Sequence, residues 1–443
     1  MFLRIKQEII MEKNTLFESY KFPSYEEILE SYSKQFSNYV YPKGDTIFGF
    51  WMQTIADLEL LDLELQGLAE KYEIDPINRT VKLKGNEDSI RLRIAHLEKV
   101  GSKPTLYSDF IDEFGDTNAY AFHNLYPYKG KFYPRVVRTL INAFKLNEKS
   151  FILDPFNGSG TTTHESSLMG IKSVGIDITP MGVILAKLKN NLLSINKQDL
   201  NFTTKDLIEI FNKIENKQWK YSNFIIYNLM LVIYFDTIDA FARTSTYNRT
   251  GKMGLFIKKF NYIKDCYNKI IKIKEKYKLN FKSATIIEGD VLELKNLKEL
   301  KEKFDAVITS PPYYFSIDYV GKDKIAYDYL SVDMKKVESK YLGMKNNGRV
   351  SRFYGQIPIK VARYYEDLKK SIENIFWALK SKGKLAIIVG DSTVNSKKIP
   401  TTMMTKNFCE EVGFKFKKLV FNPLLGARNR AIRGESIIIC EKP

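Results

Sequence analysis

Short apolar runs that alternate with helical segments constrain the fold of this chain more than any other feature. Runs typical of buried strands lie at 151–153, 173–176, 284–287, 306–308, 385–389 and 436–440. A segment of helical character follows the first run, from about Thr161 to Met169. Strands that alternate with helices predict an α/β fold with a doubly wound, mostly parallel sheet and crossover connections.

Outside this α/β part, the pattern predicts additional helical regions. Residues 1–115 are expected to form a helical N-terminal region, because a broad apolar band runs from Ile55 to Leu68. The α/β domain is expected at 116–190 and 284–443, with a basic helical insert at 191–283 and a basic loop insert at 320–363. The longest apolar run, Phe224 to Ile233, predicts a buried helix, because a membrane span needs about 20 apolar residues.

Positive charge is concentrated in the two predicted inserts. The chain has 69 Lys and Arg against 52 Asp and Glu, a net charge of +17. Residues 191–280 carry +8 and residues 320–363 carry +6, whereas residues 1–100 carry −4. Both inserts are also rich in aromatic residues, and this mixture is typical of phosphate contacts combined with base stacking. The alternative is a solvated, lysine-rich face.

Cysteine and histidine usage argues against disulfide and metal sites. The cysteines are isolated and odd in number, and they are Cys266, Cys409 and Cys440. A disulfide scaffold or zinc knuckle is therefore not expected, and a reducing cytoplasm fits. The histidines, His96, His123 and His164, have no metal-ligand spacing, so we expect no metal. The N-terminus has no apolar segment typical of a secretory signal.

A glycine-rich turn follows the first predicted strand, in the sequence FILDPFNGSGTT (151–162). Gly158 and Gly160 allow the backbone to approach a ligand closely, and the helix that opens there offers free N–H groups. Ligands of α/β sheets bind at this carboxyl edge. No lysine follows Gly160, which excludes a P-loop, and Thr163 replaces the third glycine of the dinucleotide fingerprint. A plain tight turn is the alternative.

Acidic residues end the next two strands. Asp177 is placed to accept hydrogen bonds from ribose hydroxyls, or alternatively to cap the helix after Pro180. Asp290 is placed to accept from an adenine amino group.

A proline turn, AVITSPPY (306–313), follows the fourth predicted strand. The consecutive prolines fix the backbone and leave carbonyls that point outward. Ser310 Oγ and a proline carbonyl could accept both N–H groups of an exocyclic amine, which localises its lone pair, while Tyr313 stacks on the base. Such a turn favours in-line methyl transfer to a flipped base through positioning. The alternative is a rigid loop with a tyrosine packed in the core.

Together these motifs resemble a known enzyme family. DPFNGSGTT (154–162) and TSPPY (309–313) look like motifs I and IV of the S-adenosylmethionine-dependent DNA amino-methyltransferases, which modify cytosine N4 or adenine N6. The segment HNLYPYKGKFYPR (123–135) resembles motif X of that family. The resemblance implies a Rossmann-like class I methyltransferase fold, S-adenosyl-L-methionine as the cofactor and double-stranded DNA as the substrate.

The family's functional residues transfer onto matching positions of this chain. The resemblance implies a catalytic loop of Ser310, Pro311, Pro312 and Tyr313. It implies cofactor contacts from Phe132, Pro134, Asp154, Pro155, Phe156, Gly158, Ser159, Gly160, Thr161, Asp177 and Asp290. A serine in the first loop position favours cytosine N4 over adenine N6. Methylation of cytosine carbon 5 is disfavoured, because it needs a thiolate and no cysteine here follows a proline.

The resemblance also implies a biological setting. We expect a restriction–modification or phage-defence enzyme with a cognate restriction endonuclease, and monomer and dimer stay open. Arg349, Arg352 and Arg363 are candidate DNA-binding residues that read guanine or contact phosphate. The alternatives are an RNA or protein methyltransferase of the same fold, or a DNA-binding protein without activity.

Overall fold

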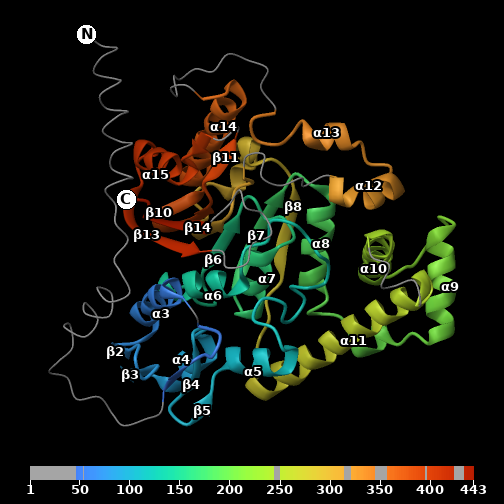
Figure 1. The fold of residues 1–443 in the computed structure, drawn as a ribbon, viewed down its shortest axis with the longest axis horizontal. Coiled ribbons are helices and arrows are strands. Elements are labelled where there is room, and N and C mark those ends of the chain that lie inside the picture. The colour runs from blue at the N-terminus through green and yellow to red at the C-terminus, as the bar shows by residue number, and fades with distance from the viewer. Residues whose placement is uncertain are drawn as a thin grey trace.

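The computed structural model describes residues 46–52, 54–243, 250–313, 321–344, 357–394, 397–423 and 434–443. Its centre is a seven-stranded sheet in the order β13-β14-β10-β9-β6-β7-β8. The strands are β6 (Phe151–Asp154), β7 (Lys172–Asp177), β8 (Ala284–Glu288), β9 (Phe304–Thr309), β10 (Leu379–Val389), β13 (Lys415–Pro423) and β14 (Gly434–Glu441). Strands β6 to β10 are mutually parallel, and β14 is antiparallel to both neighbours. This confirms the predicted doubly wound, mostly parallel sheet (Figure 1).

Both faces of this sheet are buried, which is why its strands read as continuous apolar runs. Successive residues of a strand point to opposite faces. Ile152 and Ile308 accordingly join a cluster with α3 (Ile55–Leu68) and α6 (Pro134–Ala143). Leu153 and Val307 join the cluster of α14 (Ile359–Ala378) and α15 (Thr401–Val412) on the other face. Helix α7 (Thr161–Leu168) connects β6 to β7, and helix α8 (Pro180–Asn191) follows β7.

The N-terminal region differs from the predicted helical one. Between residues 46 and 104 it contains a five-stranded antiparallel sheet, in the order β2-β3-β1-β4-β5. The strands are β1 (Ile47–Phe48), β2 (Lys71–Asp75), β3 (Thr80–Lys84), β4 (Leu97–Val100) and β5 (Lys103–Pro104). They are short and carry many charged side chains, so they give no apolar run in the sequence. The helices here are α3, which the sequence predicts, α4 (Glu87–Arg93) and α5 (Leu106–Phe114).

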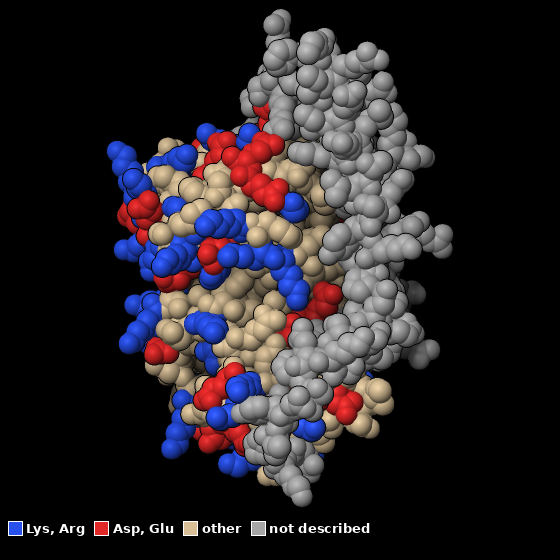
Figure 2. Space-filling view, turned by 90° about the vertical axis from the view of Figure 1, so that its left-hand side faces the viewer, with Lys and Arg blue, Asp and Glu red and all other residues tan. Residues whose placement is uncertain are grey.

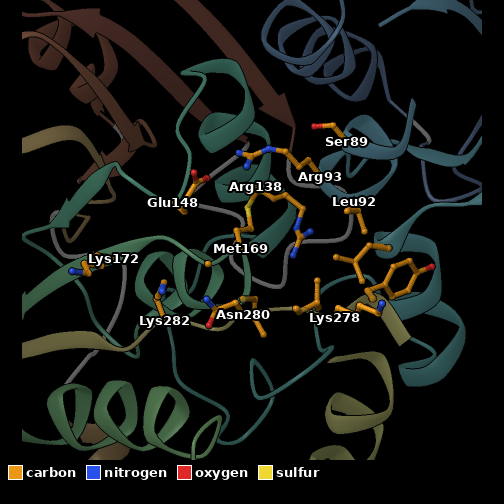
Figure 3. Close-up of a pocket in the computed structure, with 15 residues that line it drawn as sticks. Ser89, Leu92, Arg93, Arg138, Glu148, Met169, Lys172, Lys278, Asn280 and Lys282 are labelled. Atoms are coloured by element: carbon orange, nitrogen blue, oxygen red, sulfur yellow. The ribbon is translucent and has the colours of Figure 1, made fainter. Parts of the chain in front are cut away.

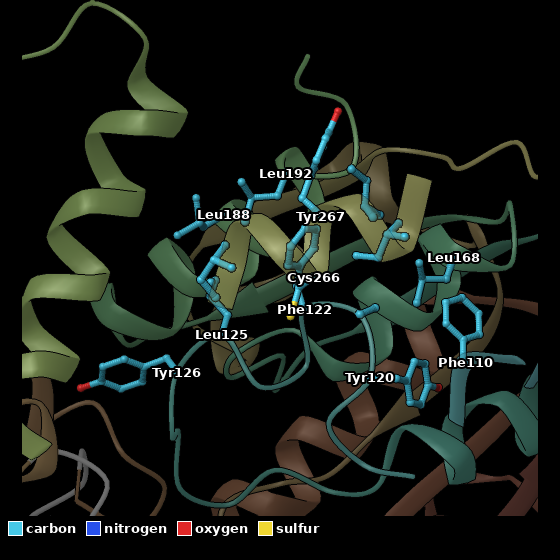
Figure 4. Packing of buried hydrophobic residues seen from close by; sticks show 14 of the residues in the cluster. Phe110, Tyr120, Phe122, Leu125, Tyr126, Leu168, Leu188, Leu192, Cys266 and Tyr267 are labelled. Carbon is cyan, nitrogen blue, oxygen red and sulfur yellow. The ribbon is translucent and has the colours of Figure 1, made fainter. Parts of the chain in front are cut away.

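The insert at 191–283 is helical, as its sequence predicts. It contains η1 (Lys197–Leu200), α9 (Thr204–Glu215), α10 (Phe224–Arg243) and α11 (Gly251–Tyr277). Among the described helices, α10 is the one with the length and composition of a membrane span. Its apolar residues, such as Leu229 and Ile233, are instead buried in the largest core cluster. Figure 4 shows part of this cluster, in which Phe122 and Leu125 pack near Leu188 of α8 and Cys266 of α11.

The insert at 320–363 is not a loop throughout. It contains η5 (Gly321–Asp323), α12 (Lys324–Leu330) and α13 (Met334–Glu338), and its last residues already belong to the core helix α14. The α12 ring of Tyr329 lies 5.3 Å from the α10 ring of Phe235. The two basic inserts therefore contact each other beside the α/β domain.

Strand β13 forms one end of the large sheet and is rich in lysine, with Lys415, Lys417 and Lys418. Charged side chains on an end strand oppose pairing with another chain. Figure 2 faces this side of the molecule and shows a band of basic residues with acidic residues among them. Two of the lysines have acidic partners, Lys417 with Glu441 at 3.6 Å and Lys418 with Asp62 at 3.7 Å.

Candidate functional site

The glycine turn lies between β6 and α7, at the carboxyl edge of the sheet. Gly158 and Gly160 have φ angles of 48° and 82°, in the left-handed region that favours glycine. A Cβ on Gly160 would lie 2.8 Å from the Cβ of Ala186 on α8. Both glycines therefore suit the left-handed backbone of the turn, and Gly160 is also required by its close packing on α8.

Asp177, at the end of β7, fixes the turn. Its Oδ2 accepts a hydrogen bond of 2.6 Å from the Gly158 N–H. Its Oδ1 accepts from the N–H and the hydroxyl of Thr179, at 2.8 and 2.5 Å, and Thr179 is the N-cap of α8. Burial raises the pKa of Asp177, although these hydrogen bonds oppose the rise. Asp177 thus holds the glycine turn and the start of α8 in one arrangement.

The segment 123–135 packs over this turn. The ring of Tyr128 lies 3.3 Å from the position that a Cβ on Gly158 would take. The Tyr128 hydroxyl is 3.4 Å from Thr179 Oγ1. Further along the segment, Phe132 is buried in the cluster of α6 and the sheet, and Pro134 is buried at the start of α6. Burial, and then the carboxylate of Glu435, raise the pKa of Tyr133.

A buried carboxylate on α7 attaches the neighbouring segment to the turn. Glu165 accepts a hydrogen bond from the Tyr120 hydroxyl, lies 2.9 Å from His123 Nε2, and accepts one of 3.0 Å from Arg138 Nε. Burial alone would raise the pKa of Glu165, but Arg138 and His123 outweigh it and hold the pKa below its usual value. Burial also lowers the pKa of His123 to about 4. His164 packs against the His123 ring and is fully buried.

Asp154 connects the glycine turn to the proline turn. Its Oδ1 accepts hydrogen bonds from Thr309 Oγ1 at 2.6 Å and from the Phe156 N–H at 3.1 Å. Its Oδ2 is buried and has no hydrogen-bond partner among the described residues. Burial raises the pKa of Asp154 to about 7, against the effect of the hydrogen bond from Thr309.

Three hydrogen bonds join the proline turn to other strands and to a helix. Ser310 Oγ donates to the Ile388 carbonyl at 2.9 Å. The Tyr364 hydroxyl donates to the Pro312 carbonyl at 3.0 Å. The Tyr313 hydroxyl donates to Glu435 Oε1 at 2.7 Å, and the Tyr313 side chain is buried. Because Ser310 uses its proton on Ile388, its oxygen keeps lone pairs to accept a further hydrogen bond.

The remaining candidates lie in different places. Asp290 accepts from the Leu292 N–H at 2.8 Å and follows Gly289, whose N–H donates to the Asp177 carbonyl, so both acidic residues lie at one edge. Arg363 is the fifth residue of α14 and directly precedes Tyr364. Arg349 and Arg352 lie outside the described residues.

The comparisons with known proteins agree with these motifs. A family model described as DNA methylase, of the N6 and N4 type, matches residues 5–188. The Type II methyltransferase M.BsoBI of Geobacillus stearothermophilus is 23% identical over 439 residues, covering 73% of this chain and 86% of the relative. The Type II methyltransferase M.MjaII of Methanocaldococcus jannaschii is 28% identical over 205 residues, covering 44% of this chain and 32% of the relative. The chain is thus similar to S-adenosylmethionine-dependent DNA amino-methyltransferases.

The solved structures that match this chain are only distantly similar to it. The rRNA methyltransferase aviRa of Streptomyces viridochromogenes gives a TM-score of 0.32 at 13% identity, covering 71% of this chain and 87% of that one. A putative DNA modification methylase of Thermus thermophilus gives 0.20 at 19% identity, covering 35% and 52%. Likenesses this weak carry no argument about substrate.

The family model matches a part of this chain that lies outside the motifs. It starts at residue 5, whereas the motifs first appear near residue 120. It includes the glycine turn and ends before the proline turn.

Two of the residues that contact the turns had no signal in the sequence. They are Tyr364 and Glu435, and each reaches its partner in the proline turn across the fold.

Proposed function

We propose that this protein transfers a methyl group from S-adenosylmethionine to the N4 amine of a cytosine flipped out of double-stranded DNA. The observation that carries the proposal is the hydrogen bond of 2.6 Å between Thr309 and Asp154. It joins the turn of the cofactor motif to the turn of the catalytic motif, on the neighbouring strands β6 and β9. A donor and an acceptor bound at these two turns would meet at one edge of the sheet.

The residues at the glycine turn fit the cofactor. The buried Oδ2 of Asp154 lacks a hydrogen-bond partner among the described residues and suits the cofactor's ammonium group. The α7 N-terminus beside Gly160 suits its carboxylate, and Asp177 and Asp290 suit the ribose and the adenine amine. We assign the surrounding contacts to Phe132, Pro134, Pro155, Phe156, Gly158, Ser159 and Thr161. When bound, the cofactor supplies an electrophilic methyl group.

The proline turn would activate the target amine. Ser310 directs its proton to the Ile388 carbonyl, so its oxygen is oriented to accept one N–H of the amine. A carbonyl of Pro311 or Pro312 would accept the other N–H, and Tyr313 would stack on the base. Accepting both hydrogen bonds localises the nitrogen lone pair and aims it at the methyl group. The serine favours cytosine over adenine.

The basic inserts would contact DNA. Arg363 directly precedes Tyr364, which donates to the proline turn at Pro312, and we assign Arg363 to DNA contacts near a flipped base. We include Arg349 and Arg352 in the same role. Phosphate contacts by the two inserts should make DNA affinity fall steeply with salt. A type II restriction–modification role in the cytoplasm, with a partner endonuclease, is part of the proposal.

The test is methyl transfer from labelled S-adenosylmethionine to unmethylated duplex DNA, followed by nucleoside mass spectrometry. N4-methylcytosine supports the proposal, and N6-methyladenine overturns the assignment of the base. Label in ribosomal or transfer RNA but not in DNA overturns the substrate. Ser310→Ala should abolish most transfer. Ser381→Ala, which removes a hydroxyl that donates to the Pro443 carbonyl, should not.

A further inference from the structure

A cavity lies at the opposite edge of the large sheet from the two turns. It has a volume of about 580 Å³. Its walls come from the end of α7, the first residue of β7, the end of α11 and the segment that leads into β8, together with parts of α4 and α6. Parallel strands start here, whereas the glycine and proline turns follow strand ends, so this cavity is separate from the candidate active site.

The cavity is strongly basic. Its lining contains five cationic side chains and one carboxylate, and these are Arg93, Arg138, Lys172, Lys278, Lys282 and Glu148. Figure 3 shows that they come from several sides of the cavity, with Lys172 and Lys282 on one side and Arg93 and Lys278 on others. None of the three lysines has an ion pair with a residue that the structure describes.

A buried arginine forms its floor. Arg138 is fully buried, and its Nε donates to Glu165 at 3.0 Å. Its Nη1 and Nη2 have no hydrogen-bond acceptor within the described ranges. The guanidinium lies over the rings of Tyr107 and Phe110, at 5.7 and 5.9 Å from their centroids. The charge of Arg138 is therefore balanced by Glu165, and the floor contributes unused N–H donors beneath a basic rim.

Helix ends alone do not account for this charge. Both α7 and α11 end at the cavity, and a helix C-terminus carries about half a negative charge. Two such ends therefore amount to roughly one charge, which is fewer than the cations gathered here. The positive excess points to an anion.

We propose that this cavity binds a small phosphomonoester with an apolar or aromatic body, of the size of a mononucleotide. The three lysines supply charge-assisted hydrogen bonds for a dianion. Arg93 adds positive charge, while its Nε and Nη2 already donate to Asn142 Oδ1 and the Leu146 carbonyl. The remaining walls are largely apolar, from Leu92, Leu106, Leu168, Met169 and Leu279. The volume falls in the range of small-molecule sites, about 300–1,000 Å³.

The test is isothermal titration calorimetry with uridine 5′-monophosphate, which lacks the adenine that the glycine turn would select. Inorganic phosphate and uridine are titrated separately. The double variant Lys172→Ala, Lys282→Ala removes two rim cations. The double variant Lys187→Ala, Lys197→Ala is the control, because both lysines are exposed, unpaired among the described residues and not in the cavity lining.

We expect saturable binding of uridine 5′-monophosphate that weakens at least about tenfold in the rim variant, as the loss of a charge-assisted hydrogen bond implies. The control should bind as the parent does. Phosphate alone and uridine alone should each bind at least about tenfold more weakly than uridine 5′-monophosphate. The proposal is overturned by an absence of binding at millimolar ligand, by equal affinity in the rim variant, or by phosphate alone binding equally well. A rim variant that binds as the parent does but has a lower melting temperature would show that the lysines neutralise the helix ends, and it would overturn the proposal. The assay contains neither DNA nor cofactor, so its result is independent of methyl transfer.

Discussion

The environment of Asp154 predicts that cofactor binding releases a proton. Burial raises the pKa of Asp154 to about 7, so a large share of the molecules hold a protonated carboxyl at neutral pH. If the cofactor's ammonium group binds beside Asp154, the adjacent cation favours the carboxylate and expels that proton. Binding of S-adenosylhomocysteine, which carries the same ammonium group, should therefore be coupled to proton release.

The size of the effect follows from the pKa. With a pKa of about 7, roughly 0.9 proton is bound at pH 6, roughly 0.5 at pH 7 and roughly 0.1 at pH 8. The rise from the ordinary value of 3.8 corresponds to about 4 kcal/mol. The raised pKa means that the folded state favours the protonated carboxyl of Asp154. This contribution to the free energy of unfolding is complete below pH 3.8 and is lost as the pH rises through about 7. Ligand affinity should correspondingly increase between about pH 6 and pH 7.

The assay is calorimetric titration of S-adenosylhomocysteine in buffers of different ionisation enthalpy, at pH 6 and pH 8. The dependence of the observed heat on the buffer gives the number of protons released. The Asp154→Asn variant, which cannot titrate here, should release none at pH 6, whereas Asp199→Asn on the insert should behave like the parent. Binding at pH 6 without proton release by the parent, or equal release by Asp154→Asn, would refute the reasoning.

Three other changes test the packing around the site. Glu165→Gln leaves its arginine partner buried without a carboxylate and should lower the free energy of unfolding by about 3–5 kcal/mol in urea, against less than about 1 kcal/mol for Glu209→Gln in an exposed pair; equal losses would contradict the network. Tyr313→Ala should lower the rate of methyl transfer, because base stacking is worth about 1–3 kcal/mol, while Tyr313→Phe keeps the ring and most of the rate. Burial lowers the pKa of Lys189 well below 10.5, so stability should fall as the pH falls below 10.5 in the parent but not in Lys189→Met; parallel pH profiles would show that this lysine keeps its ordinary pKa.

The central sheet could be predicted because its strands are buried on both faces. Each strand is a short apolar run, and the runs at Phe151, Ala306 and Leu385 fall inside β6, β9 and β10. The helix α3 could also be predicted, because an apolar band runs along it, and the structure adds a capping box formed by Thr54 and Asp57. Local pattern and tertiary burial agree in these elements.

The N-terminal sheet and the segment at 320–363 could not be predicted for the opposite reason. The register of β2 and β3 pairs Lys71 with Lys84 and Glu73 with Lys82, so charged residues occupy much of both strands. Their stability depends on neighbours rather than on their own apolar pattern. The α12 helix likewise depends on contacts with α10, which come from a distant part of the sequence.

The candidate site likewise has one part that could be predicted from the sequence and one part that could not. The two turns could be predicted because glycine and proline restrict the backbone in ways that the sequence states directly. The groups that hold the turns could not, since Tyr313 and Glu435 are separated by 122 residues and Tyr364 and Pro312 by 52. A single glutamate or tyrosine in a sequence gives no sign of such a partner.

Asp177 does not cap α8 itself but holds the N-cap residue Thr179, and this role is compatible with ribose binding. Its oxygens already accept three hydrogen bonds, from the Gly158 N–H and from the N–H and hydroxyl of Thr179. A carboxylate has about four lone-pair sites, so one remains for a hydroxyl of a bound ribose. Because it holds both the glycine turn and the N-cap residue Thr179, this carboxylate is fixed in position before any ligand arrives, and that fixed position is what a ligand-binding acceptor needs. The contacts that orient the start of α8 therefore favour ribose binding at this strand end.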